Sequence, residues 1–565
     1  MKSKYVYGLN MILISALMTL SACSGDTNEK GSPSPSEPAK EANSQSSTPT
    51  NGKYTPAIEV STVRYTDAGF KFKDGESLDK NIWNGIFEDE LGIKVKNMWV
   101  VDKSQYNQKL NVTIASGTLP DFFEVDKVTM QRLVDEGALE DLTAVYEKYG
   151  SPFAKKTLTV DGGAAIKAST VNGKLMAIPH TASNGGVAST EMIWLRTDWL
   201  KKVNLSPPKT MDDVMKIAEA FSKMDPDENG KNDTYGLAIN KEMLQNFGSV
   251  RGFFNGYHAY PDYWVKDASG KIVFGSVQPE MKVALQKLQD LYKNGVLDKE
   301  FSVKDTNKIL EDVNAEKIGL IYGHLWDPPG KTYDINYLKV KDAAYPLWQT
   351  YPIVSVDSAP VKVQANPTAE TFFVVRKGVK NPEVVVKLLN TYLKKYIETD
   401  YSGSVNPFIA KDGIFPAKFA PVQLESPNLN LEAWYKVVDA LKTGDGSKLD
   451  FPASVHFDRI SKFRNGDYKM WYSDRTFGPE GAFKVIDQYD KQKTFVFDEF
   501  ISSPTPTMVD KLSTLTKMEM EVFTKIIMNA APVSDFDKFV EQWKLSGGSK
   551  IEQEANEAYK KNQGN

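Results

Sequence analysis

The residues from Asp225 to Asp233 have the spacing of a cation-binding loop. They match the EF-hand pattern at positions one, three, five, six and nine, where oxygen ligands alternate around a hard cation and a glycine allows a sharp turn. Position twelve departs from the pattern, because Gly236 stands where a bidentate Glu is expected. The pattern predicts a structural Ca²⁺ site, provided that a remote carboxylate supplies the missing ligands. The predicted site residues are Asp225, Asp227, Asn229, Lys231 and Asp233. The alternative is a polar loop of Asx turns that caps the preceding helix.

A second group of residues suits the recognition of a sugar. Flat aromatic rings stack against the C–H faces of sugar rings, whose hydroxyl groups need carboxylates, amides or arginine as partners. The predicted ligand-binding rings are Trp326, Trp264, Tyr257 and Trp348. Trp326 is the strongest candidate, because it follows the predicted strand 318–322 in a turn. The alternative for any single ring is a place in the core, which we expect for Trp194 in its apolar strand.

Several other chemistries are excluded by composition. The chain has one Cys and four His, so it can form neither an internal disulfide nor a Cys-rich zinc site. Residues 323–332 imitate a phosphate-binding loop, but six residues separate the glycines instead of four, and Pro328 and Pro329 have no backbone N–H to donate. The sequence contains no Gly-x-Ser-x-Gly, His-Glu-x-x-His or Gly-x-Gly-x-x-Gly motif.

Length and charge narrow the class of protein further. A chain of 565 residues allows two to four domains, and 41% hydrophobic with 25% charged residues is typical of a globular protein. The 69 Lys and Arg residues against 73 Asp and Glu residues give a formal net charge of -4. Nucleic acid is therefore not an expected partner.

The N-terminus has the features of a bacterial export signal. Lys2 and Lys4 precede an apolar stretch, 11–20, that is too short to span a bilayer, so residues 1–22 are a predicted signal peptide. The segment Leu20-Ser-Ala-Cys23 resembles the lipobox of bacterial lipoproteins, which implies cleavage before Cys23 and a lipid on its sulfur. Residues 23–53 are rich in Ser, Pro and Thr and predict a flexible tether; the alternative is a low-complexity segment without a spacing role.

From residue 58 the pattern alternates between strands and helices. Strand-like segments at 58–63, 93–101 and 122–125 are separated by helical patterns, and this β-α-β-α-β order predicts a mainly parallel sheet covered by helices. Ligands bind at the carboxyl ends of such strands. Asp121 and Glu124 are therefore predicted ligand-binding residues, and the alternative is that they are solvated loop residues.

Further helices and strands are predicted along the rest of the chain. Thr210-Met-Asp-Asp213 resembles a capping box that opens a helix, and 279–294 has helical apolar spacing. Strands are expected at 317–322 and 371–375, with a helix from Asn381. The C-terminal region predicts long helices with apolar stripes at 515–526 and 536–543, closed by Gly547-Gly548.

Several segments together resemble the family 1 extracellular solute-binding proteins, in the lipoprotein branch that serves ABC-type sugar importers. They include Ala115-Ser-Gly-Thr-Leu-Pro-Asp121, Asn172-Gly-Lys-Leu-Met-Ala-Ile-Pro179, Trp194-Leu-Arg-Thr-Asp-Trp-Leu200, Thr505-Pro-Thr-Met508 and 536–548. Their order and spacing carry the resemblance, which spans nearly all of the chain after residue 53.

The resemblance implies a two-lobed α/β fold of the type II periplasmic-binding-protein kind, with hinged lobes and long C-terminal helices. By analogy, the N-terminal lobe holds 54–185 plus 360–410, and the C-terminal lobe holds 186–359 plus 411–565. The lobes would close over a ligand by hinge motion. The resemblance also implies that Trp326 faces the ligand and that loops like 225–233 bind calcium.

These observations predict a monomeric lipoprotein on the outer face of the bacterial cell membrane, held there by a lipid on Cys23. It would capture a carbohydrate, preferably an oligosaccharide, and deliver it to an ABC permease, without being an enzyme. Two alternatives remain open. One is a secreted glycoside hydrolase or lyase, which needs two carboxylates facing each other across a cleft. The other is a binding lipoprotein for peptides, or one coupled to a sensor.

Overall fold

The computed structural model describes residues 52–67, 70–183, 186–327, 348–399, 406–409, 414–502 and 504–563. Residues 48–565 form one compact unit. The predicted signal peptide, Cys23 and all but the last two residues of the predicted tether lie outside the described residues. Among the described helices, none is long and apolar enough to cross a membrane.

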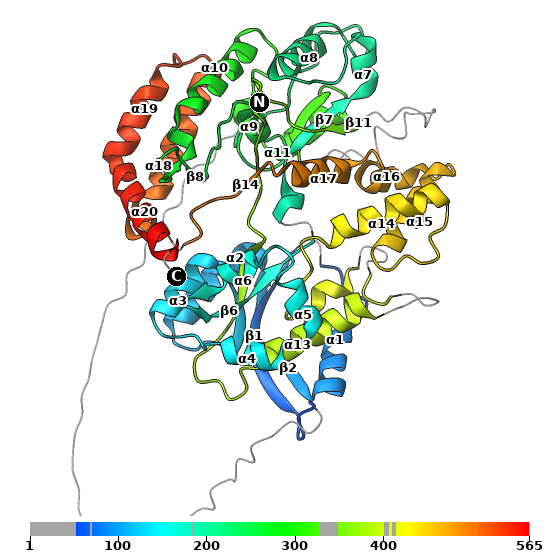
Figure 1. Cartoon of the computed structure of the whole chain (residues 1–565), viewed down its shortest axis with the longest axis vertical. Helices are drawn as coiled ribbons and strands as arrows, with labels where there is room; N and C mark the ends of the chain where they lie inside the picture. The colour runs from blue at the N-terminus through cyan, green and yellow to red at the C-terminus, as the bar shows by residue number, and fades with distance from the viewer. Residues whose placement is uncertain are drawn as a thin grey trace, which may run out of the picture. The chain divides into compact units, whose positions relative to one another are not determined.

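The first group of strands builds the sheets of an N-terminal lobe (Figure 1). β1 (Ile58–Thr66) pairs in parallel with β2 (Ile93–Asp102), as the sequence predicts. β13 (Ala369–Val375) lies between β3 (Phe122–Asp126) and β6 (Ala177–Thr181) and is antiparallel to both. The prediction of a mainly parallel sheet is therefore wrong for this part. β13 comes from a distant part of the chain, so no crossover helix forces a parallel direction on it. The strands β4 (Thr170–Val171) and β5 (Lys174–Leu175) form a short hairpin.

Short helices surround these strands. They are α1 (Ile82–Ile86), α2 (Lys103–Ala115), α3 (Lys127–Asp135), α4 (Thr143–Tyr149), α5 (Pro152–Thr157), α6 (Ala164–Ala168) and α13 (Val384–Leu393), with single turns at 87–91, 394–398 and 416–419. The side chain of Asp102, the last residue of β2, accepts a hydrogen bond from the Ser104 backbone N–H and so begins α2 directly at the strand end. This link fixes Lys103 at the carboxyl edge of the strands.

The second group of strands belongs to a C-terminal lobe. β7 (Met192–Arg196) lies between β10 (Leu320–Gly323) and β11 (Trp348–Tyr351), antiparallel to both. β8 (Trp264–Lys266) and β9 (Ile272–Phe274) form a hairpin, and β12 (Val363–Gln364) pairs in parallel with β14 (Phe495–Val496). The predicted strands at 317–322 and 371–375 are confirmed within a few residues.

The C-terminal lobe contains the longest described helix, α18 (Pro506–Ile527), with 22 residues. Its helices are α7 (Thr197–Lys202), α8 (Met211–Lys223), α9 (Arg251–Gly256), α10 (Pro279–Lys293), α11 (Thr306–Asn314), α14 (Leu429–Thr443), α15 (Ala453–Arg464), α16 (Trp471–Phe477), α17 (Ala482–Gln492), α18, α19 (Asp535–Trp543) and α20 (Ser549–Gln563). Figure 1 shows α18 packed against α10, α19 and α20. The predicted capping box at Thr210 and Asp213 is present, whereas the chain continues as α20 after the Gly547 kink instead of stopping there.

Three hydrophobic cores define which segments belong together. One core draws on residues 188–363 and 431–555, and the other two draw on residues 54–178 and 369–424. The two α/β lobes of the predicted fold class therefore have separate cores. The predicted boundaries at 360 and 410 differ from these cores, because Val363 packs in the C-terminal core and Phe419, Val422 and Leu424 pack in the N-terminal one.

Within the part of the chain that the structure describes, the two sets of cores are joined near residues 181–188, 363–369 and 424–431. Two of these connections are tied together by hydrogen bonds. The Ser183 hydroxyl donates to the Glu425 carboxylate at 2.6 Å, and the Glu425 backbone N–H donates to the Thr181 carbonyl at 2.9 Å. Connections of this kind between two lobes are where a hinge motion would take place.

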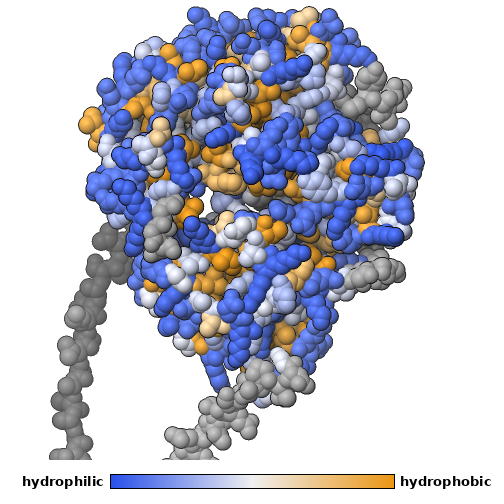
Figure 2. Space-filling model, viewed as in Figure 1, coloured by the Kyte–Doolittle hydropathy of each residue, from blue (hydrophilic) through white to orange (hydrophobic). Residues whose placement is uncertain are grey.

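Hydrophilic residues cover most of the face shown in Figure 2, with hydrophobic residues gathered in small groups between them. This distribution agrees with the buried positions of most large apolar side chains, which fill the three cores. The surface composition is typical of a water-exposed globular protein.

Candidate functional site

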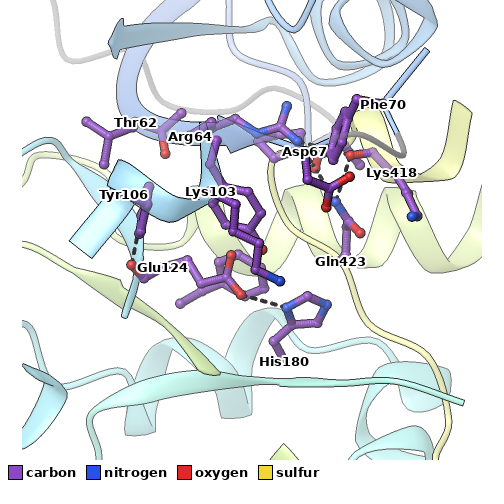
Figure 3. Close-up of a pocket in the computed structure, with 15 residues that line it drawn as sticks. Thr62, Arg64, Asp67, Phe70, Lys103, Tyr106, Glu124, His180, Lys418 and Gln423 are labelled. Carbon is purple, nitrogen blue, oxygen red and sulfur yellow. Dashed lines mark hydrogen bonds and ion pairs between the residues drawn. The ribbon is translucent and has the colours of Figure 1, made fainter. Parts of the chain in front are cut away.

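A cavity of about 200 Å³ opens in the N-terminal lobe (Figure 3). It lies at the carboxyl ends of β1, β2 and β3, where the sheet order predicts a ligand site. Its lining residues come from β1 and the segment after it, α2, β3, β6, β13 and the segment 418–423. They are Thr62, Val63, Arg64, Tyr65, Asp67, Phe70, Lys103, Tyr106, Glu124, His180, Phe373, Lys418, Ala420, Pro421 and Gln423. The cavity is smaller than the ~300–1,000 Å³ of common ligand pockets and suits one sugar ring better than a whole oligosaccharide.

The floor of the cavity is set by the register of three strands. Glu124 lies opposite Phe373, and His180 lies opposite Thr371. Residues opposite each other, or two apart along a strand, point to the same face of a sheet, so these four side chains share one face. His180 Nδ1 lies 2.7 Å from Glu124 Oε1, and the Thr371 hydroxyl donates to the same oxygen.

The charges of Glu124 and His180 stabilise each other. Burial acts to raise the pKa of Glu124, but the His180 charge, hydrogen bonds from His180 and Thr371, and the Arg64 charge together hold it below its ordinary value. Burial acts to lower the pKa of His180, but the Glu124 carboxylate raises it above its ordinary value. Both shifts favour a charged pair in the folded protein.

Arg64 forms one wall of the cavity through contacts distant in sequence. Its guanidinium donates to the carbonyl oxygens of Lys418, Phe419 and Ala420 at 3.1, 2.7 and 2.9 Å. These bonds tie the end of β1 to the segment 418–420 and hold the guanidinium in place. Burial lowers the pKa of Arg64 to about 10, so the group stays charged at neutral pH.

Aromatic rings supply the apolar part of the lining. Tyr65 and Tyr106 meet edge to face with their centroids 5.1 Å apart, and the Phe373 ring lies 5.3 Å from the His180 ring. The Tyr106 hydroxyl donates to the Glu124 backbone carbonyl at 2.9 Å, which fixes this ring against β3 (Figure 3). The cavity thus combines flat apolar faces with charged and polar groups, the combination that sugars require.

Of the six predicted ligand-binding residues, Glu124 alone lines this cavity. Trp264, Tyr257 and Trp348 are buried in the C-terminal core, and Trp348 has no exposed surface. The structure therefore gives these three rings a packing role, the alternative that the sequence left open. Trp264 and Trp348 lie in strands, and a ring on the buried face of a strand has no surface left for a ligand.

Asp121 and Trp326 are partly buried, but neither lines the cavity. Asp121 lies just before β3 and pairs with Arg376 at 2.9 Å while accepting from Ser61, so it ties strands together outside the cavity. Trp326 is partly buried at the end of β10, with its ring stacked on His324 at 5.0 Å between centroids and 9° between planes. It does not line the described cavity.

The sequence interpretation missed Arg64, Lys103 and His180. The rule that selected Glu124, a position at the carboxyl end of a strand, also applies to Arg64 at the end of β1 and Lys103 after β2. His180 had no comparable signal, because its role depends on the pairing of β6 with β13, and Thr371 lies 191 residues away.

The predicted cation-binding loop follows α8. Asp225 accepts hydrogen bonds from the Asn229 and Gly230 backbone N–H groups, and the Asn229 amide donates to Asp227 and Asp233. The pKa of Asp227 is raised by burial and by the neighbouring Asp225 and Asp233 carboxylates. Oxygen Oδ1 of Asp227 is buried without a hydrogen-bond partner.

These features fit a hard cation, because crowded carboxylate and amide oxygens are what Ca²⁺ prefers. No group of three or more His, Cys, Asp and Glu side chains among the described residues is arranged to hold a metal ion. Position twelve has no room for a ligand side chain, because a Cβ at Gly236 would lie 2.1 Å from the Ala218 carbonyl oxygen. The calcium site therefore stays a prediction.

The match to known proteins agrees with this architecture. The family model described as "Bacterial extracellular solute-binding protein" matches residues 71–395, more than half of the chain. The chain belongs to this family of binding proteins.

Two curated relatives cover most of the chain. It is 27% identical over 492 residues to "Lipoprotein LipO" of Bacillus subtilis strain 168, a match covering 85% of this chain and 89% of the relative. It is 23% identical over 469 residues to "Polygalacturonan/rhamnogalacturonan-binding protein YtcQ" of the same strain, covering 82% of this chain and 84% of that protein.

Solved structures show the same two-lobed fold. A structure described as "HMO binding ABC-transporter associated Solute Binding Protein" from Bifidobacterium longum infantis aligns with a TM-score of 0.64 and 16% identity, covering 89% of this chain and 98% of that one. An EF-hand mutant of the Streptococcus pneumoniae substrate-binding protein FusA, in complex with fructo-nystose, aligns with a TM-score of 0.57 and 17% identity, covering 90% and 100%. At 16% and 17% sequence identity, these alignments show a shared fold alone.

Proposed function

We propose that this protein captures an extracellular carbohydrate and delivers it to an ABC permease. The observation that carries the proposal is the cavity, where the Glu124–His180 pair and Arg64 stand beside Tyr65, Tyr106, Phe70 and Phe373. Charged groups bind sugar hydroxyls and the rings pack against C–H faces. The names of YtcQ and of the structural relatives support a saccharide as the ligand class.

Hinge closure would couple ligand binding to delivery. Two of the segments that join the two sets of cores are held together by the Ser183–Glu425 and Thr181–Glu425 bonds. A ligand shifts the open–closed equilibrium by its difference in affinity for the two states. A permease that recognises the closed state would then receive the protein mainly when it is loaded.

Two further features complete the proposal. A lipid on Cys23 would hold the protein on the outer face of the membrane, and the name of the LipO relative supports this anchor. A Ca²⁺ ion would bind Asp225, Asp227, Asn229, the Lys231 backbone and Asp233, and rigidify the loop after α8. The EF-hand named for the FusA structure supports this site.

Calorimetry on the mature protein tests the proposal. We expect saturable binding of one member of a panel of fructo-, malto- and galacturono-oligosaccharides, and no binding of tri- to pentapeptides. Glu124→Gln should weaken the binding, whereas Glu59→Gln, an exposed position on β1 outside the cavity, should leave it unchanged. Binding of peptides alone would contradict the proposal.

A second assay addresses the enzyme alternative. The cavity presents two carboxylates, Asp67 and Glu124, and Glu124 is occupied by His180 and Thr371. The same panel incubated overnight with the protein should release no new reducing ends and no unsaturated products. Release that disappears in Glu124→Gln would instead favour a hydrolase or lyase.

A further inference from the structure

The cavity of the N-terminal lobe has more positive than negative charge. Its described lining includes three permanent cations, Arg64, Lys103 and Lys418, together with His180, whose ring is favoured in its charged form. The carboxylates in the same lining are Asp67 and Glu124. The cavity lining is therefore positively charged, whereas the whole chain carries a formal net charge of -4.

The cations are not neutralised by ion pairs among the described residues. Arg64 uses three hydrogen bonds, all to backbone carbonyl oxygens, which leaves two of its five N–H donors. Lys103 lies 5.4 Å from the centroid of the Tyr65 ring, and Lys418 lies 5.2 Å from that of Phe415. Both lysines are exposed at the cavity rim.

The Glu124 carboxylate in this lining is already engaged. Glu124 accepts from His180 and Thr371, so one of its oxygens serves two partners inside the protein. Figure 3 shows the Lys103 side chain extending toward the Glu124–His180 pair, above the floor of the cavity. A ligand entering between Arg64 and Lys103 therefore meets two cationic groups that form no ion pair at contact distance with a carboxylate among the described residues.

We infer that the carbohydrate carries negatively charged carboxylates, as an oligosaccharide of uronic acid units does, and that Arg64 and Lys103 bind one of these carboxylates. This inference rests on the proposed function and narrows its substrate class. Arg64 keeps unused N–H groups that can donate to such a carboxylate, and charge-assisted hydrogen bonds of this kind are stronger than those to a neutral hydroxyl. The partly exposed ring of Tyr65 remains available for the sugar face.

The test compares acids with their own neutral esters. Calorimetry is carried out with the trisaccharides of galacturonic acid and of glucuronic acid, each as the free acid and as the fully methyl-esterified form, with galactotriose and maltotriose as neutral sugars. We expect a free acid to bind roughly tenfold or more tightly than its ester at low salt. The difference in affinity between the acid and its ester should become smaller when NaCl is raised to about 0.5 M, because salt screens the interaction between charges.

Two lysines on the same helix provide the matched variants. Lys103→Gln should weaken binding of the acid about tenfold and leave the ester unchanged. Lys109→Gln, which alters an exposed lysine of α2 outside the cavity, should change neither. Circular dichroism of both variants should give the melting temperature of the unmodified protein.

The possible outcomes separate the two proposals. If an ester or a neutral trisaccharide binds as tightly as any acid, or if Lys103→Gln affects acid and ester alike, the acidic-ligand inference is overturned while the carbohydrate function stands. If no saccharide binds but a peptide does, the carbohydrate function itself fails. Tight binding of an acid that depends on Lys103 and on salt supports both.

Discussion

His180 Nδ1 lies 2.7 Å from Glu124 Oε1, and this contact joins β6 to β3 across the intervening strand β13. The two residues are 56 positions apart in sequence and meet only because β13 pairs with both strands. The pair also forms the floor of the proposed ligand site. The stability of this part of the sheet and the chemistry of the cavity are therefore linked.

The first prediction concerns pH. The folded state raises the pKa of His180, so its contribution to stability is full below the unfolded-state value of about 6.5 and is lost as pH rises through the folded value. His180→Gln should therefore lower the free energy of unfolding most at pH 5.5 to 6, by about 1 kcal/mol, and less at pH 9. Thermal unfolding of both proteins between pH 5.5 and 9 measures this.

The His258→Gln variant is the control for this experiment, because His258 lies outside the cavity and pairs with the exposed Asp357. We expect it to leave the Glu124–His180 pair unchanged. A destabilisation by His180→Gln that grows with rising pH would contradict the charged pair.

The second prediction concerns the loop after α8. Adding CaCl₂ should raise the melting temperature of the unmodified protein, because a cation at 100 times its dissociation constant stabilises the folded state by about 2.7 kcal/mol. Asp227→Ala should abolish the rise, since this carboxylate is crowded and has a buried oxygen without a partner. Asp212→Ala, at an exposed position on α8, should keep it. If the unmodified protein shows no rise, the calcium proposal fails.

The third prediction concerns Trp326. Its ring is partly buried and stacked on His324, so its removal should leave the fold intact. If this ring faces the ligand, Trp326→Ala should weaken binding of the best oligosaccharide in the calorimetric panel roughly tenfold. Phe497→Ala removes a ring that is 48% exposed and should have no effect on affinity. If Trp326→Ala binds the oligosaccharide as tightly as Phe497→Ala and the unmodified protein do, Trp326 does not contact the ligand.

The fourth prediction separates packing from binding. Trp348 is fully buried in the C-terminal core, so Trp348→Ala should cost roughly 3–5 kcal/mol in unfolding free energy. Trp348→Phe, which keeps most of the volume, should cost much less and bind oligosaccharide normally. Urea unfolding and calorimetry measure both effects. A Trp348→Phe variant that folds well but loses binding would restore the predicted ligand role.

The fifth prediction concerns the anchor. Cys23→Ser removes the sulfur that would carry the lipid, so the protein should move from the membrane fraction to the medium of the producing cells. Immunoblots of the two fractions measure the change. Retention of the variant in the membrane fraction would contradict a lipid on Cys23.

Much of the fold could be predicted from local patterns. The Thr210 capping box, the apolar stripe of α10 and the long C-terminal helix α18 are set by residues close together in sequence. The antiparallel placement of β13 could not be predicted, because its partners β3 and β6 lie some 190 to 250 residues earlier. The extent of α20 was missed because a glycine pair usually ends a helix, whereas here Gly547 forms a kink.

The candidate site was only partly predictable for a similar reason. Glu124 could be found from its place in β3, but the role of Arg64 depends on carbonyl groups of residues 418–420, more than 350 residues away. The predicted rings Trp264 and Trp348 are of the right type for a sugar, yet aromatic composition does not distinguish a cleft from a core. Burial decides the role of these rings, and burial is a property of the complete fold.

A crystal structure with the best-binding oligosaccharide of the panel tests the central claim most directly. We expect a sugar ring in the cavity of the N-terminal lobe, with Arg64 and Glu124 within hydrogen-bond distance and Tyr65 or Tyr106 against its face. A sugar bound at a site that contacts none of these residues would contradict it.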